Sequence, residues 1–76
     1  MILLKNIEKN DNVISFTGYE EGKIYKNFYM KLDAETFDVL HLSCKPSIYT
    51  QQACMRIMLL MQESSELPSE SIGYWN

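Results

Sequence analysis

Hydrophobic residues recur at helical spacing in one long stretch of the chain, residues 47–63, with the sequence SIYTQQACMRIMLLMQE. Good helix formers dominate this stretch and neither Gly nor Pro interrupts it, so the pattern predicts a helix over 47–63. Pro46 stands just before it, and the hydroxyl of Ser47 or of Thr50 is suited to cap its first turn. At about 100° per residue, one side collects the residues that we expect to face the core: Ala53, Cys54, Ile57, Met58 and Met61, with Leu60 at the edge.

The opposite side of the predicted helix is also partly apolar. Met55 and Leu59 lie there one turn apart, in the company of Gln52, Arg56 and Glu63. One interpretation is that these two side chains are ordinary exposed hydrophobic residues, which folded proteins carry in plenty. The other is that they form a second contact surface, for another copy of the chain or for a partner protein, where flexible Met side chains adapt to different shapes.

The residues before the helix alternate between apolar and polar positions, which is typical of β-strands. Turns containing Asn, Asp or Gly separate the alternating stretches. The pattern predicts strands over residues 2–8, 13–19, 23–32 and 37–43. In the first of them, the period of two predicts one face with Ile2 and Leu4, and Leu3 and Ile7 then belong to the other face. A short helix beginning at Asp33 competes with the turn before the fourth strand, because Asp is a good N-cap.

The clearest alternation lies in residues 23–32, and it has the pattern of a half-buried antiparallel strand. One face is expected to pack under the helix. It carries Ile24, Phe28, Met30 and Leu32, and only Lys26 interrupts this apolar row. The other face is expected to be open and to carry Lys23, Tyr25, Asn27, Tyr29 and Lys31. Aromatic side chains stack on bases and lysines follow phosphates, so this second face is the best nucleic-acid signal in the chain.

These elements predict an α+β fold, a small two-layer sandwich in which an antiparallel meander of three to four strands packs on the helix. A chain of 76 residues has the length of one domain, so we expect residues 1–76 to fold as a single small domain. Pro68 prevents the helix from continuing into the polar stretch after residue 63. The C-terminal segment Ile72–Trp75 is apolar and aromatic, and we expect it to dock on the sheet or the helix. Whether it forms a strand stays open, and a free tail that binds another protein is the alternative.

Composition and charge narrow the functional classes. A formal net charge of −3 argues against nonspecific binding to nucleic acid, which needs clustered Lys and Arg. A chain of this size has a marginal core alone, so self-association into a homodimer is a reasonable route to stability. There is no signal-peptide pattern and no run of the roughly 20 apolar residues that span a membrane. With two cysteines expected as free thiols, this predicts a soluble cytoplasmic protein.

Catalytic and metal-binding patterns are weak. If residues 37–43 form a strand, His41 and Cys44 fall on opposite faces, which works against a Cys–His dyad. One His with Cys44 and Cys54 does not give the spacing of a zinc site, and the helix methionines follow core spacing rather than a copper motif. The three glycines are isolated and form no phosphate loop. We therefore expect no catalytic site, no cofactor, no metal and no small-molecule substrate.

The sequence thus predicts a small non-catalytic protein–protein interaction module that self-associates and acts as an adaptor, a regulator or an inhibitor of another protein. The alternative is a nucleic-acid-associated regulator that uses the face with tyrosines and lysines in residues 23–32. Interfaces favour Tyr, Trp, Met and Arg, and the contact residues that we expect are Met55, Leu59, Arg56, Tyr25, Tyr29 and Trp75.

Overall fold

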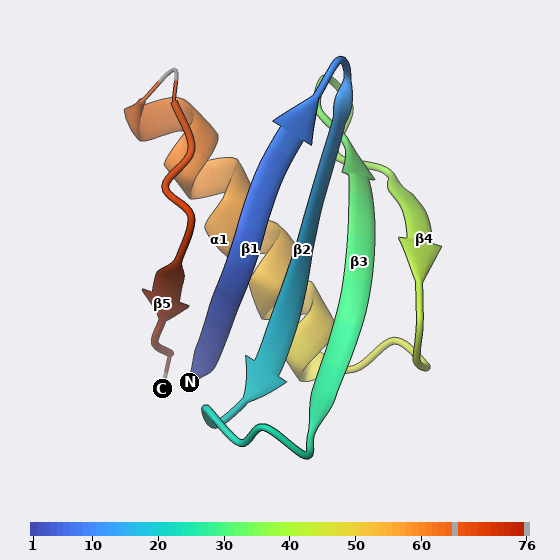
Figure 1. The fold of residues 1–76 in the computed structure, drawn as a ribbon, viewed down its shortest axis with the longest axis vertical. Coiled ribbons are helices and arrows are strands. Elements are labelled where there is room, and N and C mark those ends of the chain that lie inside the picture. The colour runs from blue at the N-terminus through green and yellow to red at the C-terminus, as the bar shows by residue number, and fades with distance from the viewer. Residues whose placement is uncertain (65, 76) are drawn as a thin grey trace.

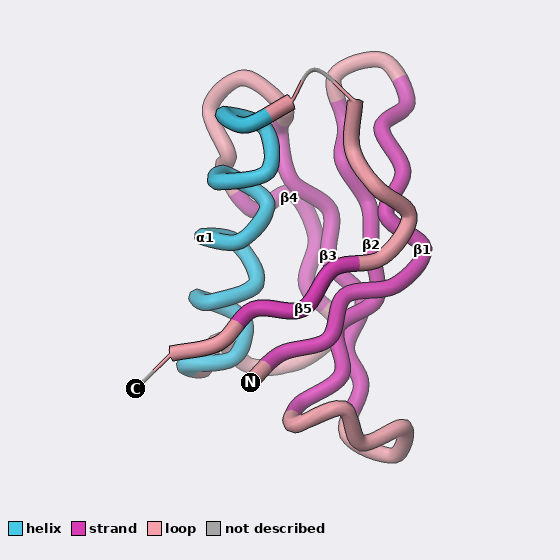
Figure 2. Tube along the Cα trace, turned by 90° about the vertical axis from the view of Figure 1, so that its left-hand side faces the viewer, coloured by secondary structure: helices cyan, strands magenta, loops and turns pink. Residues whose placement is uncertain are grey.

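The computed structural model describes residues 1–64 and 66–75, and these residues form five strands and one helix. The elements are β1 (Ile2–Asn10), β2 (Val13–Glu20), β3 (Asn27–Asp33), β4 (Val39–Leu42), α1 (Ile48–Glu63) and β5 (Ser71–Gly73). All strand pairs are antiparallel, and the spatial order is β4-β3-β2-β1-β5. The helix lies against one face of the sheet, so the molecule has two layers (Figures 1 and 2). The predicted α+β sandwich is confirmed.

The C-terminal segment docks on the sheet edge as a strand. After the meander β1–β4, α1 carries the chain back across the sheet, and β5 pairs with β1 at the edge opposite β4 (Figure 1). The backbone N–H of Ile7 also donates to the carbonyl of Ser69 at 3.0 Å, which ties the preceding segment to β1. The predicted docking is confirmed, and the question that the sequence left open is answered by a strand over Ser71–Gly73.

The helix begins and packs largely as its sequence predicts. Ser47 is the N-cap, its side chain accepts from the backbone of Thr50, and the Thr50 hydroxyl accepts from the backbone of Ser47 in a capping box. Both predicted capping residues therefore take part. Met58 was expected in the buried stripe, but it is 39% exposed. The buried side of α1 is centred near residues 53 and 57, so position 58, which is turned by 100° from 57, lies at its flank. The buried residues of α1 are Thr50, Ala53, Ile57 and Leu60.

A β-bulge in β1 corrects the predicted faces of that strand. Asn6 has a left-handed backbone with φ of 55°, and the register with β2 shifts between Lys5 and Glu8. A bulge inserts one extra residue and so reverses the alternation beyond it. Ile7 consequently lies on the buried face with Ile2 and Leu4, and the prediction that it shares a face with Leu3 is wrong.

The third strand is shorter than predicted, because residues 21–26 form a loop. Glu21 and Gly22 have φ of 53° and 70°, and turn hydrogen bonds run from Gly22 N–H to Tyr19 O and from Lys26 N–H to Lys23 O. Left-handed residues end strand pairing here, and β3 starts at Asn27 rather than Lys23. Ile24 is 79% exposed, so its predicted place in the core is wrong.

The segment between β3 and β4 is a turn and not a short helix. One carboxylate oxygen of Asp33 accepts from the backbone N–H groups of Glu35 at 2.8 Å and Thr36 at 3.0 Å. Phe37 then has φ of 62°, which prevents helical continuation, and β4 starts at Val39 rather than at residue 37. These contacts hold the pKa of Asp33 below its usual value, with the backbone hydrogen bond from Thr36 as the largest cause.

A close approach between Gly18 and Phe28 gives a test of the core. The two residues are cross-strand partners, and a Cβ atom on Gly18 would lie 2.3 Å from Cζ of Phe28. We expect Gly18→Ala to lower the free energy of unfolding by about 1–3 kcal/mol, the usual cost of overpacking a core. Urea denaturation measures it. Phe28→Leu in the same chain should make the double variant less destabilised than the sum of the two single changes; strict additivity would contradict the account.

The Asp33 turn predicts a pH dependence. A lowered pKa in the folded protein means that the ionised carboxylate stabilises the fold above its unfolded pKa near 3.9, and that this contribution is lost as the pH falls through the folded pKa. Asp33→Asn should therefore lower stability at neutral pH and reduce the loss of stability between about pH 5 and pH 2. Urea denaturation across that range measures both effects. Glu8→Gln, at an exposed position of β1, is the control; identical pH profiles for the two variants would contradict the prediction.

Candidate functional site

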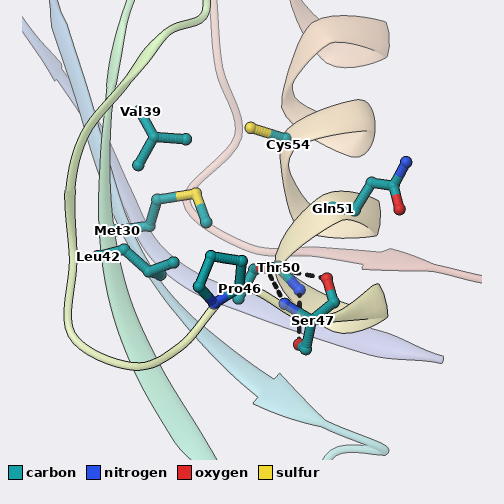
Figure 3. Close-up of a pocket in the computed structure, with 8 residues that line it drawn as sticks. All are labelled: Met30, Val39, Leu42, Pro46, Ser47, Thr50, Gln51 and Cys54. Carbon is teal, nitrogen blue, oxygen red and sulfur yellow. Dashed lines mark hydrogen bonds between the residues drawn. The ribbon is translucent and has the colours of Figure 1, made fainter.

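The helix covers the sheet unevenly. α1 runs closest to β1, β2 and β5 and crosses behind β1 and β2 in Figure 1. On the β4 side of the helix there is a groove of about 550 Å³, which we call the α1–β4 groove (Figure 3). It is lined by Met30, Val39, Leu42, Pro46, Ser47, Thr50, Gln51 and Cys54. The groove therefore lies between α1 and β4, above the buried side chain of Met30.

The α1–β4 groove presents a mainly apolar surface. None of its lining residues carries a formal charge. The hydroxyls of Ser47 and Thr50 are engaged in the capping box, where the Thr50 hydroxyl also donates to the carbonyl of Ser47 at 3.0 Å (Figure 3). Burial raises the pKa of the Cys54 thiol, so this group stays protonated at neutral pH. The lining thus favours an apolar occupant over a polar small molecule, which needs several placed polar groups.

The side of α1 that faces away from the sheet forms an exposed ridge. Ile48, Met55 and Leu59 are 50%, 53% and 43% exposed, and Gln52 lies between them in the sequence. These four residues, which we call the outer ridge, are spaced 4, 3 and 4 apart, the spacing of helices that pack on other helices. Within α1 only Arg56 and Glu63 carry a formal charge. Exposed Met beside an Arg is typical of a protein interface.

Arg56 lies beside the outer ridge, but it is tied to the C-terminal strand. Its Nε–H donates to the hydroxyl of Ser71 at 2.9 Å, and its aliphatic stem lies over Gly73. A second hollow, of about 260 Å³, lies here between the ridge and β5. Its lining includes Met55, Leu59, Gly73 and the exposed Tyr74. The structure therefore brings three expected contact residues together and gives Arg56 the additional role of holding β5 against α1.

Trp75 lies away from the outer ridge, in a cluster at the first turn of α1. Its ring meets the ring of Tyr49 edge to face, with centroids 5.5 Å apart. The Tyr49 hydroxyl donates to Oε1 of Glu21 at 3.2 Å, and the Glu21 carboxylate also pairs with the α-amino group of Met1. Desolvation, and then the negative charge of Glu21, raise the pKa of Tyr49. Through its contact with Tyr49, Trp75 packs against the first turn of α1.

Tyr25 and Tyr29 do not share a strand face. Tyr25 lies in the loop over residues 21–26, whereas Tyr29 lies on the open face of β3. There its ring lies 6.0 Å from the ring of His41, and Nζ of Lys31 lies 6.0 Å from its centroid. Tyr19 pairs with Asn27 and lies on the same open face, which the sequence reading missed. The aromatic and basic surface is therefore smaller along β3 than predicted.

His41 and Cys44 are positioned by different surroundings. His41 packs beside Tyr29, whereas the Cys44 thiol donates to the carbonyl of Lys45 at 3.4 Å. Desolvation and the charge of Glu20 raise the pKa of Cys44, which makes its thiol a poor nucleophile at neutral pH. Within residues 1–64 and 66–75, three or more His, Cys, Asp or Glu side chains nowhere gather closely enough to hold a metal ion.

Searches against protein families, curated proteins and solved structures find no match to this chain. The described part of the chain contains no helix with both the length and the apolar character needed to cross a membrane. The candidate contact surface is therefore inferred from the geometry of this chain alone. The α1–β4 groove was missed by the sequence reading, and so were Ile48 and Tyr74 beside the expected residues. The 4-3-4 spacing of the outer ridge is the signal that would have added Ile48.

Proposed function

We propose that this protein is a small non-catalytic interaction module that binds protein through the outer ridge of α1 and self-associates by this surface. The observation that carries the proposal is the ridge itself: three large apolar side chains, each close to half exposed, on the outer side of α1, with Gln52 among them and Arg56 beside them. Exposed apolar side chains gathered on one side of a helix are typical of an interaction site. An adaptor, a regulator or an inhibitor would all use such a surface.

The rest of the molecule supports a binding role rather than chemistry. The two thiols have raised pKa values, and the Cys44 thiol donates to a backbone carbonyl. The helix is anchored at its first turn by the capping box and along its side by the bond from Arg56 to Ser71. A rigidly held helix presents its exposed side chains at low entropic cost, which favours binding.

Replacing Met55 and Leu59 of the outer ridge by lysine should abolish self-association. We expect the solution mass of the wild-type chain, measured by light scattering, to rise from 8.9 kDa towards twice that value with increasing concentration. The Met55→Lys/Leu59→Lys variant should stay at the chain mass, because lysines at the centre of an interface are costly to bury. Both positions are exposed, so the circular dichroism spectrum should not change.

The matched control is Ile24→Lys/Leu40→Lys, which adds the same charge at two exposed apolar positions outside the outer ridge. This variant should assemble like the wild type. A wild-type chain that keeps the chain mass throughout, or two double variants that assemble alike, would overturn the proposal. Loss of the fold in the Met55 and Leu59 variant would show that these residues belong to the core.

A further inference from the structure

The sheet face opposite α1 is open, and strand pairing gathers aromatic and basic side chains on it. α1 lies against the other face, so no helix of the described residues covers this one (Figures 1 and 2). In β2 and β3 every second residue is buried on the helix side, and the residues between them point to the open face. Four strands contribute to what we call the tyrosine face, and its members are Lys5, Thr17, Tyr19, Tyr29, Lys31 and His41.

Three aromatic rings run diagonally across the tyrosine face. Tyr29 pairs with Thr17, which stands two residues before Tyr19 in β2. The two tyrosines are therefore diagonal neighbours on adjacent strands, about 7–8 Å apart. On the other side of Tyr29, the ring of His41 on β4 follows, with 6.0 Å between the two ring centroids. One ring thus stands at each step from β2 to β4.

Both lysines of the tyrosine face lie on the same side of this line of rings. Lys5 pairs with Thr17, and Nζ of Lys31 lies 6.0 Å from the centroid of the Tyr29 ring. Across the strand rows that hold the rings, the charged residues are Lys5, Lys31 and Glu8, a net charge of +1 against −3 for the whole chain. A face that is more positive than the rest of the molecule complements a chain of phosphates.

Two further carboxylates near this face are committed to other contacts. Asp33, one strand row beyond the rings, accepts from two backbone N–H groups of its own turn. Glu21, in the loop after β2, accepts from the hydroxyl of Tyr49 on α1. Neither carboxylate lies among the rings.

We infer that the tyrosine face binds a single strand of nucleic acid. Successive bases stack on the rings of Tyr19 and Tyr29, and the phosphates pass along the side that carries Lys5 and Lys31. Stacking supplies much of the affinity in such a site and needs no dense cluster of Lys and Arg, so a chain with a net negative charge can hold the strand. A duplex keeps its bases stacked inside and offers the rings no free base. The inference is independent of the outer ridge, which lies on the helix layer.

Fluorescence anisotropy of a labelled oligothymidylate of about 12 nucleotides, in about 50 mM salt, tests the inference. The wild-type chain should give a saturable rise. Tyr29→Leu removes the ring but keeps an apolar side chain, and it should weaken binding at least about fivefold, because one stacked base is lost. Lys31→Gln should reduce the slope of log affinity against log salt concentration by about 0.7, the value for one phosphate contact on a single strand.

The matched controls lie outside the tyrosine face. Tyr74 and Lys45 are exposed, and Tyr74→Leu and Lys45→Gln should bind like the wild type. Inorganic polyphosphate has phosphates but no bases, so it should displace the probe less well than unlabelled oligothymidylate at the same phosphate concentration. Equal displacement, equal losses in the face variants and their controls, or no rise in anisotropy would overturn the inference.

Chemical-shift mapping on the wild-type chain gives a second measurement that does not depend on the folding of any variant. When oligothymidylate is added, the largest changes should fall on the backbone amides of Tyr19, Tyr29 and Lys31. Changes confined to α1 would show that the strand binds elsewhere and would overturn the assignment to the tyrosine face.

Discussion

The packing of α1 on one face of the sheet determines which apolar side chains of this structure are buried. A helix about 10 Å wide covers roughly two strands, and here it is placed over β1 and β2 and close to β5. The capping box at Ser47 and the bond from Arg56 to Ser71 hold it in that place. The helix-facing side chains of β3 are buried, and an apolar groove remains between α1 and β4. On the outer side of α1, Ile48, Met55 and Leu59 stay exposed.

The hydrophobic periodicity of the sequence and its turn-forming residues predicted the two-layer architecture. The alternation in residues 13–19 and 23–32 predicted the sheet, and the helical period of residues 47–63 predicted the helix that packs on it. The apolar and aromatic residues of Ile72–Trp75 correctly predicted that this segment docks, and Trp75 packs on Tyr49 of α1. Met55 and Leu59 were singled out because they interrupt a polar helix face, and the structure exposes both.

What the sequence reading could not supply depends on single backbone angles and on distant pairings. The left-handed conformation of Asn6 reverses the alternation in β1. Asn tolerates this conformation, but its presence alone does not distinguish a bulge from a regular strand position. Lys26 breaks the alternation before β3, and the turns around Gly22 show that this break was the true strand boundary. The α1–β4 groove joins side chains from β3, β4 and α1, so it follows from where the helix rests on the sheet and not from any local pattern.

The central claim is that two copies of the chain associate through the outer ridge of α1. Isotope-filtered NMR on a dimer of labelled and unlabelled chains tests it most directly. The account predicts contacts between the methyl groups of Met55 or Leu59 in one copy and methyl groups of the other copy. Contacts between copies that involve neither Met55 nor Leu59, or the absence of any, would contradict it.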